Sequence, residues 1–256
     1  FGARLQPHQS QGVAESDHRS QLRTQRTQAC MQSLPENIRG VLFDLDGTLL
    51  DSAPDLYAAL VAQCVEEGVA PPSYPPVREV VSRGARAVLR CAFAERGEAA
   101  LEALTPRYLQ LYQGVMAQQT QAFDGVDDLL IRIEAHGLRW GIVTNKAAFL
   151  TDELVSRIGW AGRASAVVSG DTLPVKKPDP APVLLACERA GVAPAHSLFV
   201  GDDRRDIQAG AAAGLYTVAV SWGYLDGGDP HTWGADKVLA HPAELATLWQ
   251  LQPVAA

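Results

Sequence analysis

From residue 40 onward the chain alternates short apolar runs with segments of helical periodicity, and this alternation restricts the fold more than any other feature. Such alternation is typical of a parallel β-sheet with crossover helices. The predicted strands cover residues 40–43, 139–144, 166–169, 197–200, 216–220 and 237–239. Helices are predicted at 127–135, 151–158, 180–190 and 206–213, with Gly191 and Gly214 where helix ends favour a left-handed residue. The sequence therefore predicts an α/β fold with a doubly wound parallel sheet.

The interval from residue 55 to residue 121 interrupts this alternation, because it contains several amphipathic helical patterns and no convincing strand. Its segment VAPPSYPPV (69–77) carries four prolines, and we expect a non-helical connection there. An insertion after the first strand of a doubly wound sheet lies over the carboxyl ends of the strands, where such folds bind ligands. We predict a core of residues 37–54 and 122–256 and a small all-helical cap domain of residues 55–121.

The first thirty residues differ in composition from the rest, since they are rich in Gln, Arg, Ser and His and show no sustained apolar period. We expect an N-terminal extension of residues 1–36 to be disordered. The stretch lacks the apolar centre of a secretory signal, and its acidic residues argue against a transit peptide. Met31 is a candidate for the biological start.

The overall composition is that of an ordinary globular protein, with 47% hydrophobic and 20% charged residues among 256. No apolar stretch approaches the roughly 20 residues that cross a bilayer, so we expect no membrane partner. A formal net charge of -7 disfavours a nucleic-acid partner, which needs a basic face. The four cysteines are far apart and form no C-x-x-C pair, so we predict neither disulfides nor a zinc site and expect a cytoplasmic protein.

Polar and charged residues follow four of the predicted strands. Because the carboxyl ends of parallel strands meet at one edge of a sheet, we expect these residues to share one crevice. A lone aspartate at such a place is more often a helix cap or turn residue, and a lone lysine is more often a solvated charge. Together they indicate an acidic metal site beside an anion-binding site. The residues are Asp44 and Asp46, Thr144 and Asn145, Lys176 and Lys177, and the GDDRRD segment at 201–206.

This set of motifs resembles the haloacid-dehalogenase-like phosphatase superfamily, whose first motif D-x-D-x-T is matched by DLDGT at 44–48. The resemblance covers residues 39 to about 245. It implies that Asp44 is the nucleophile that forms an aspartyl phosphate and that Asp46 is the general acid and base. Members that cleave carbon–halogen bonds lack the second aspartate, so Asp46 points to phosphate chemistry. Gly47 would permit the sharp turn of this loop, and Thr48 would support it.

The resemblance also implies a Mg²⁺ ion, held by the Asp44 side chain, the Asp46 backbone carbonyl, Asp202 and water. Asp203 and Asp206 are second choices as ligands, and Asp206 is also a candidate cap for the helix that follows. The segment GDDRRD departs from the common G-D-S-x-x-D pattern at Asp203, which leaves the ligand set open.

Three further residues would bind the transferring phosphoryl group. Thr144 would donate its hydroxyl, Asn145 would add an amide or backbone donor, and Lys177 would supply a point charge that also screens Asp44. The resemblance selects Lys177 because it directly precedes Pro178, and we interpret Lys176 as a solvated surface charge.

In the predicted cap, Gly84 lies between Arg83 and Arg86. We expect a turn here that recognises the substrate, called the substrate-reading turn below, because an arginine guanidinium can bind a carboxylate through two parallel hydrogen bonds. A helix start with ordinary surface arginines is an equal alternative. The segments VSRGARAVLRCAFA and TWGAD resemble those of phosphoglycolate phosphatases and of the related N-acetylmuramic acid 6-phosphate phosphatases. This resemblance implies a small phosphorylated substrate with a carboxylate, phosphoglycolate being the first choice, and a monomer or homodimer. A phosphosugar mutase on the same fold is another alternative, which would need a second phosphate site in the lid.

Overall fold

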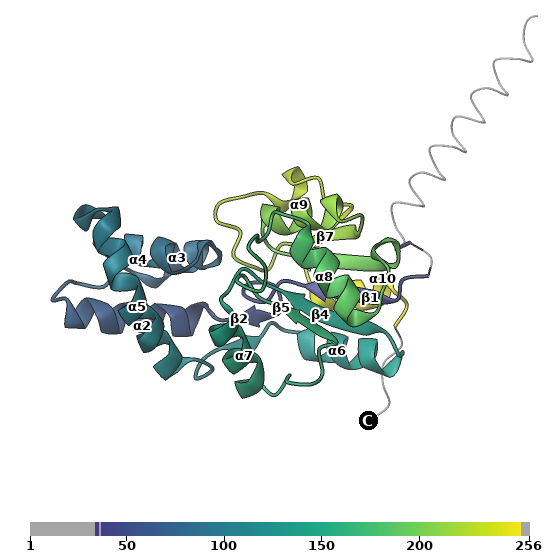
Figure 1. The fold of residues 1–256 in the computed structure, drawn as a ribbon, viewed down its shortest axis with the longest axis horizontal. Helices are drawn as coiled ribbons and strands as arrows, with labels where there is room; N and C mark the ends of the chain where they lie inside the picture. Colours follow the sequence, from purple (N-terminus) through teal and green to yellow (C-terminus); the bar gives the residue numbers. More distant parts are fainter. Residues whose placement is uncertain (1–33, 36, 252–256) are drawn as a thin grey trace, which may run out of the picture. The chain divides into compact units, whose positions relative to one another are not determined.

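A computed structural model gives the structure of the chain and describes residues 34–35 and 37–251 (Figure 1). Every helix and strand described here belongs to one compact unit, Pro35–Ala256. Residues 1–36, for which disorder was predicted, lie outside the described residues except for Leu34 and Pro35, so this disorder stays a prediction. None of the described helices is both long enough and apolar enough to cross a membrane.

Within the described part of the chain, six parallel strands form the central sheet in the order β5-β4-β1-β6-β7-β8. The central strand β1 is buried on both faces, as expected for an apolar run between two parallel neighbours. Each strand agrees with its predicted range to within one residue, so the predicted doubly wound sheet is confirmed. The strands are β1 (Gly40–Phe43), β4 (Arg139–Val143), β5 (Ala166–Val168), β6 (Ser197–Gly201), β7 (Tyr216–Val220) and β8 (Lys237–Leu239).

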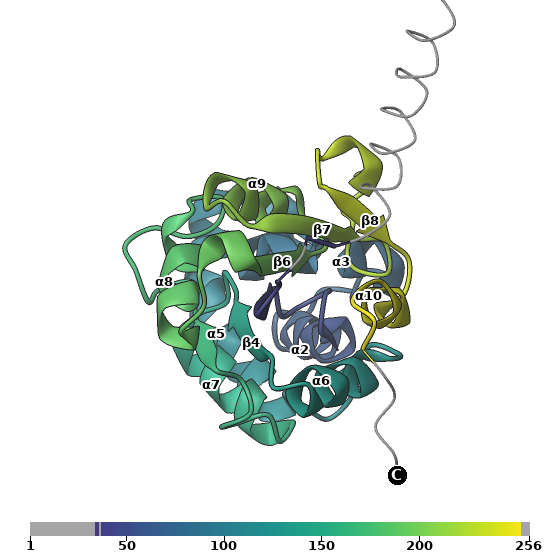
Figure 2. The same ribbon diagram turned by 90° about the vertical axis from the view of Figure 1, so that its right-hand side faces the viewer.

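Helices cover both faces of this sheet (Figure 2). α8 (Ala181–Ala190) and α9 (Arg204–Ala212) pack on one face, where they bury an apolar cluster that includes Leu42, Val143 and Phe199. α6 (Val126–Ala135) and α10 (Pro242–Leu248) pack together on the other face, and α7 (Ala148–Arg157) connects β4 to β5. Gly191 ends α8 in the left-handed conformation, as predicted.

Four α-helices lie within residues 53–115, as the amphipathic patterns predicted, and α5 packs along both α2 and α4. One detail of the prediction is wrong: the proline-rich connection was expected to be non-helical to residue 77, but α3 begins at Tyr74. Pro75 lies in the first turn of that helix, where backbone N–H groups have no intrahelical partner, so proline removes no hydrogen bond there. The helices are α2 (Ala53–Glu66), α3 (Tyr74–Val80), α4 (Ala85–Phe93) and α5 (Glu98–Val115). Their description as a cap domain stays an interpretation.

The chain enters and leaves the helices α2 to α5, here called the helical block, through two paired segments, which the sequence analysis did not predict. β2 (Leu50–Asp51) and β3 (Gln121–Ala122) form a short antiparallel pair. The buried carboxylate of Asp55 accepts hydrogen bonds from the backbone N–H groups of Gln119 and Thr120 at 2.9 and 3.0 Å, and from the Thr120 hydroxyl at 2.6 Å. Two-residue strands have no periodicity to detect, so their pairing follows only from the tertiary fold.

Candidate active site

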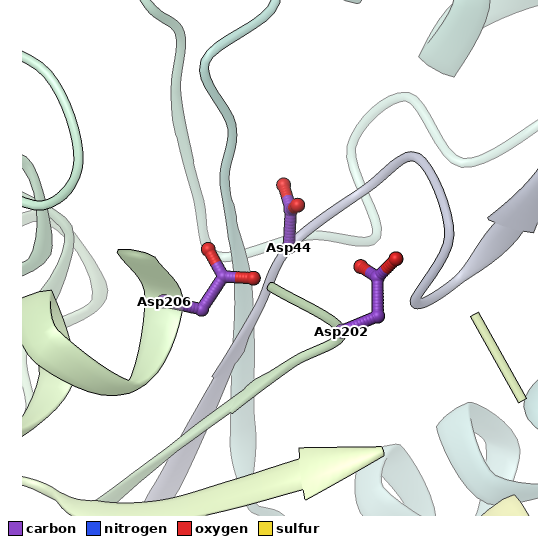
Figure 3. A group of neighbouring side chains, drawn as sticks. All are labelled: Asp44, Asp202 and Asp206. Carbon is purple, nitrogen blue, oxygen red and sulfur yellow. The ribbon is translucent and has the colours of Figure 1, made fainter. Parts of the chain in front are cut away.

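Three buried aspartates meet at the carboxyl ends of β1 and β6 (Figure 3). Asp44 directly follows β1, Asp202 directly follows β6, and Asp206 lies in the first turn of α9. One carboxylate oxygen from each lies within 4.8 Å of the others. The structure thus brings together two aspartates that the sequence placed in the metal site and a third, Asp206, that was a second choice.

Lys177 lies among these carboxylates. Its Nζ is 2.9 Å from Oδ1 of Asp44 and 2.7 Å from Oδ1 of Asp206, and only 3% of the residue is exposed. Asn145 holds the backbone of this lysine: its Oδ1 accepts from the Lys177 N–H at 3.1 Å, and its Nδ2 donates to the Lys177 carbonyl at 3.0 Å. The predicted phosphate-binding residues Asn145 and Lys177 therefore contact each other, and here the Asn145 amide orients the lysine.

Burial raises the pKa of Asp202 well above its usual range, and the charges of Asp44 and Asp206 raise it further. Burial also raises the pKa of Asp206 to about 7, although Lys177 partly opposes this effect. Buried like charges cost folding free energy unless a cation neutralises them. A divalent ion fits this site, because hard divalent cations prefer oxygen ligands and Mg²⁺ needs only a few protein carboxylates beside its waters.

Asp202 of this cluster also forms hydrogen bonds that hold the loop after β1 in place. The Thr48 hydroxyl donates to Oδ1 of Asp202 at 2.8 Å, and the Tyr224 backbone N–H donates to Oδ2 at 2.8 Å. Gly47 has a φ of +92°, and a Cβ atom at this position would lie 2.1 Å from Oδ2 of Asp202. The turn predicted at Gly47 is confirmed, and the close approach of Asp202 is a second reason for glycine there.

The carboxylate of Asp46 lies apart from the cluster and contacts Lys146. The Nζ atom of Lys146 is 3.1 and 3.0 Å from the two Asp46 oxygens, and it donates to the Tyr112 hydroxyl at 3.0 Å. Ser52 donates to Oδ1 of Asp46 at 2.5 Å. Burial is the largest single influence and lowers the pKa of Lys146, but the charges of Asp46 and Tyr112 and the hydrogen bonds to both residues together raise that pKa above its ordinary value, so this ammonium remains protonated.

Sequence reasoning missed Lys146 and Tyr112. Lys146 stands two positions after Thr144 at the end of β4, and this position was a usable signal, since polar residues at that edge of the sheet were expected to share the crevice. Tyr112 had no such signal, because a tyrosine on an amphipathic helix is most often a packing residue.

A cavity of about 250 Å³ lies over these residues, between the carboxyl ends of the strands and the helical block. The core contributes Asp44, Asp46, Thr144, Asn145, Lys146 and Lys177 to its lining. The helical block contributes apolar and aromatic side chains, namely Leu56, Tyr108, Leu109 and Tyr112. The predicted catalytic and phosphate-binding residues therefore line one cavity.

The predicted substrate-reading turn lies at the edge of this cavity. Gly84 lines it with a φ of +85°, at the start of α4. Arg83 also lines it, but its side chain is 58% exposed and forms an ion pair with Asp226 of the core. Arg86 is exposed and is absent from the residues that line the cavity. Substrate reading by Arg83, Gly84 and Arg86 stays a prediction.

Asp203, the other second choice for the metal, has a different environment. Its carboxylate caps α9 and pairs with Arg205 through both oxygens, at 2.8 and 2.6 Å. Arg205 also donates to the backbone carbonyl of Ser82 in the helical block at 2.9 Å. Asp203 thus connects the core to the helical block through Arg205, a contact that no local sequence pattern predicts.

Residues 41–220, more than half of the chain, match the sequence model of the haloacid dehalogenase-like hydrolase family. The chain belongs to this family. A phosphoglycolate phosphatase of Xanthomonas campestris pv. campestris (strain 8004) is 47% identical over 208 residues, which cover 81% of this chain and 94% of the relative. An N-acetylmuramic acid 6-phosphate phosphatase of Pseudomonas aeruginosa is 43% identical over 210 residues, which cover 81% and 93%.

Among solved structures, a crystal structure of a predicted phosphoglycolate phosphatase from Haemophilus somnus 129PT superposes on this haloacid dehalogenase-like hydrolase with a TM-score of 0.76. The superposition covers 84% of this chain and 99% of the other, with 24% sequence identity. At that identity the similarity supports the fold alone.

Proposed function

We propose that this haloacid dehalogenase-like hydrolase is a magnesium-dependent phosphomonoesterase that acts through an aspartyl phosphate on Asp44, with 2-phosphoglycolate as its substrate. The observation that carries this proposal is the arrangement of Lys177 and the three-aspartate cluster at a cavity between the core and the helical block. Such a site can hold a phosphate between a lysine and a metal ion while a carboxylate faces the phosphorus atom.

Asp44 is oriented for attack by the groups around it. Its Oδ1 accepts a hydrogen bond from the Leu45 N–H at 2.7 Å and contacts Lys177. Among the described residues no donor is assigned to Oδ2, which makes Oδ2 the attacking oxygen. The new bond joins Asp44 Oδ2 to phosphorus, the bond from phosphorus to the ester oxygen breaks, and Asp46 gives its proton to that oxygen.

Hydrolysis of the aspartyl phosphate then restores the enzyme. Asp46 takes a proton from a water molecule that attacks phosphorus, and the bond to Asp44 breaks to release inorganic phosphate. Thr144 and Lys177 hold the phosphoryl oxygens during both steps. A Mg²⁺ ion held by Asp44, Asp202 and the Asp46 backbone carbonyl would neutralise the negative charge of the cluster and of the phosphate.

Phosphoglycolate is the proposed substrate for two reasons. The relative from Xanthomonas campestris carries that name at 47% identity. In addition, a cavity of about 250 Å³ is smaller than the roughly 300–1,000 Å³ typical of sites for drug-sized ligands, which favours a short acid. N-acetylmuramic acid 6-phosphate is the second candidate, because the relative from Pseudomonas aeruginosa that bears this name is 43% identical.

A steady-state panel of phosphate esters tests the substrate. We expect phosphoglycolate to have the highest kcat/KM among phosphoglycolate, N-acetylmuramic acid 6-phosphate and several sugar phosphates. A higher value for the muramic acid ester would select the second candidate. Phosphate release without any bisphosphate activator would exclude a phosphosugar mutase.

The variant Asp44→Asn tests the chemistry. We expect it to fold, to release no phosphate and to form no phosphoenzyme in rapid-quench experiments, whereas the wild type is trapped as a phosphoenzyme. A phosphorylated Asp44→Asn enzyme would contradict the assignment of the nucleophile.

A further inference from the structure

Lys146 has three close contacts on one side of the cavity. Its side chain is 8% exposed and lines the cavity, with Nζ near both Asp46 oxygens and 3.0 Å from the Tyr112 hydroxyl. The same Nζ atom lies 4.6 Å from the centre of the Tyr112 ring. Lys146 is therefore a buried cation next to the proposed general acid, away from the three-aspartate cluster.

The other cations that line the cavity have different places. Lys177 contacts Asp44 and Asp206, on the side where the phosphoryl group would lie. Arg205 is held by Asp203, and the exposed Arg83 is held by Asp226. Lys176 is exposed, and no ion pair is assigned to it among the described residues. Lys146 is thus the lysine that lies beside the proposed acid.

The cavity that Lys146 lines has apolar and aromatic side chains among its walls. Leu56, Leu109 and Leu150 line the cavity together with the rings of Tyr108 and Tyr112. A charge in such surroundings interacts more strongly with an opposite charge than it would in water. An anionic group of the substrate that lies beside Lys146 would therefore be stabilised by the charge of its ammonium.

The position of Asp46 sets how far that anionic group can be from the ester. A general acid must lie within about 2.6–3.2 Å of the atom that it protonates, which here is the ester oxygen. Lys146 Nζ lies 3.0 Å from an oxygen of the same Asp46 carboxylate. A carboxylate attached to the carbon that bears the ester oxygen would consequently come within reach of Lys146.

We propose that Lys146 is a specificity-determining residue that binds a substrate carboxylate attached to the carbon bearing the ester oxygen. The substrate carboxylate would replace one of the contacts of Lys146 with Asp46 or Tyr112. This inference rests on the proposed phosphatase function and deepens it, since it defines the substrate class as short 2-phosphooxy acids. Phosphoglycolate has this arrangement, whereas in N-acetylmuramic acid 6-phosphate a sugar ring separates the carboxylate from the ester.

The test compares kcat/KM for 2-phosphoglycolate with kcat/KM for ethyl phosphate, which has the same carbon chain and no carboxylate. The wild-type ratio should strongly favour phosphoglycolate. In Lys146→Met the ratio should fall by about tenfold to a hundredfold, the value of one charge-assisted hydrogen bond. The matched control Lys176→Met, which changes another lysine of the same cavity, should keep the wild-type ratio.

Several outcomes would overturn the inference. If Lys146 only orients Asp46, kcat/KM falls by the same factor for both substrates in Lys146→Met, and the ratio of the two values stays as in the wild type. A fall of the ratio in Lys176→Met instead would assign the carboxylate to Lys176. A wild type that prefers phosphoglycolate, with a Lys146→Met variant that keeps the preference, overturns this inference alone. A wild type that shows no such preference overturns the proposed substrate as well.

A second measurement needs no variant and so does not depend on Lys146→Met being folded. The wild type is assayed with 3-phosphooxypropanoate, whose carboxylate lies one carbon farther from the ester. We expect its kcat/KM to fall towards that of ethyl phosphate. A value equal to that of phosphoglycolate would contradict the short distance that Lys146 imposes.

Discussion

The ammonium of Lys177 lies 2.9 Å from Oδ1 of Asp44, although 133 positions separate the two residues in the chain (177 minus 44). The contact is buried, and Asp206 shares the same ammonium at 2.7 Å. Lys177 neutralises part of the acidic cluster, and in the proposed mechanism it also lies where a phosphate dianion approaches Asp44. The first effect concerns stability and the second concerns catalysis, so they can be measured separately.

Replacing Lys177 with Met should lower both the stability of the protein and its catalytic activity. Removing one partner from a buried ion pair typically costs about 3–5 kcal/mol, because the remaining charges are left uncompensated. We expect a loss of this size in the free energy of unfolding of the metal-free protein in urea, together with loss of turnover. Mg²⁺ should restore part of the stability and none of the activity. The control Lys176→Met, at an exposed position, should unfold like the wild type; equal stability of both variants would contradict the role of Lys177 in the cluster.

Removal of divalent metal should abolish turnover and lower the melting temperature, because Asp202 and Asp206 are then buried among like charges. Adding Mg²⁺ should reverse both changes. Ca²⁺ should raise the melting temperature without supporting turnover, since it accepts more ligands at longer distances and would let Asp44 bind it through both oxygens. Phosphate release and thermal melts in each ion check this, and full activity in Ca²⁺ alone would count against the proposed geometry.

Gly47→Ala should weaken metal binding as well as stability. Its Cβ would lie 2.1 Å from Oδ2 of Asp202 and 2.8 Å from the Tyr224 ring, at a φ that disfavours any side chain. Backbone strain of this kind costs of the order of 1–3 kcal/mol. Gly159→Ala is the matched control: it has a φ of +78° and no atom within 4 Å of the added Cβ, so it should lose stability and keep its Mg²⁺ affinity. Equal Mg²⁺ affinities in calorimetric titrations of the two variants would refute the contact with Asp202.

Arg83→Ala should lower kcat/KM for phosphoglycolate and for ethyl phosphate in parallel, because Arg83 contacts Asp226 and is mostly exposed. Exposed ion pairs are worth about 0–1 kcal/mol, so the loss should be no more than about fivefold. Arg86→Ala, at an exposed position outside the cavity lining, should have a smaller effect. A loss confined to phosphoglycolate in either variant would instead support the substrate-reading turn predicted from the sequence.

The strands and core helices could be predicted because each follows from a local pattern. β1 and β7 have the predicted bounds, since an apolar run flanked by turn residues can be buried in only a few ways. Helix starts were less accurate: α7 begins at Ala148 rather than at residue 151, and α3 begins inside the proline-rich segment. Terminal turns depend on capping contacts, which the apolar period does not report.

The order of the site residues along the chain was enough to predict that Asp44, Thr144 and Lys177 share a crevice and that Asp202 lies close to Asp44. Parallel strands point their carboxyl ends to the same edge of the sheet, so a residue that follows one strand lies near a residue that follows its neighbour. The same reasoning could not separate Asp203 from Asp206, since both follow β6 within a few positions. The helical geometry of α9 separates them: Asp206 faces Lys177, whereas Asp203 caps the helix and contacts Arg205.

The sequence by itself determined the parallel sheet, the helical insertion after its first strand and the edge at which the acidic and basic residues gather, because all three depend on local periodicity and on chain order. Only the tertiary structure decided which charges are paired. The contacts of Lys146 with Asp46 and Tyr112, of Asp55 with Thr120 and of Arg205 with Ser82 each join segments far apart in the chain. Side-chain charges interact over a few ångströms, and distances of that size are set by the packing of the helical block on the core, which no local pattern encodes.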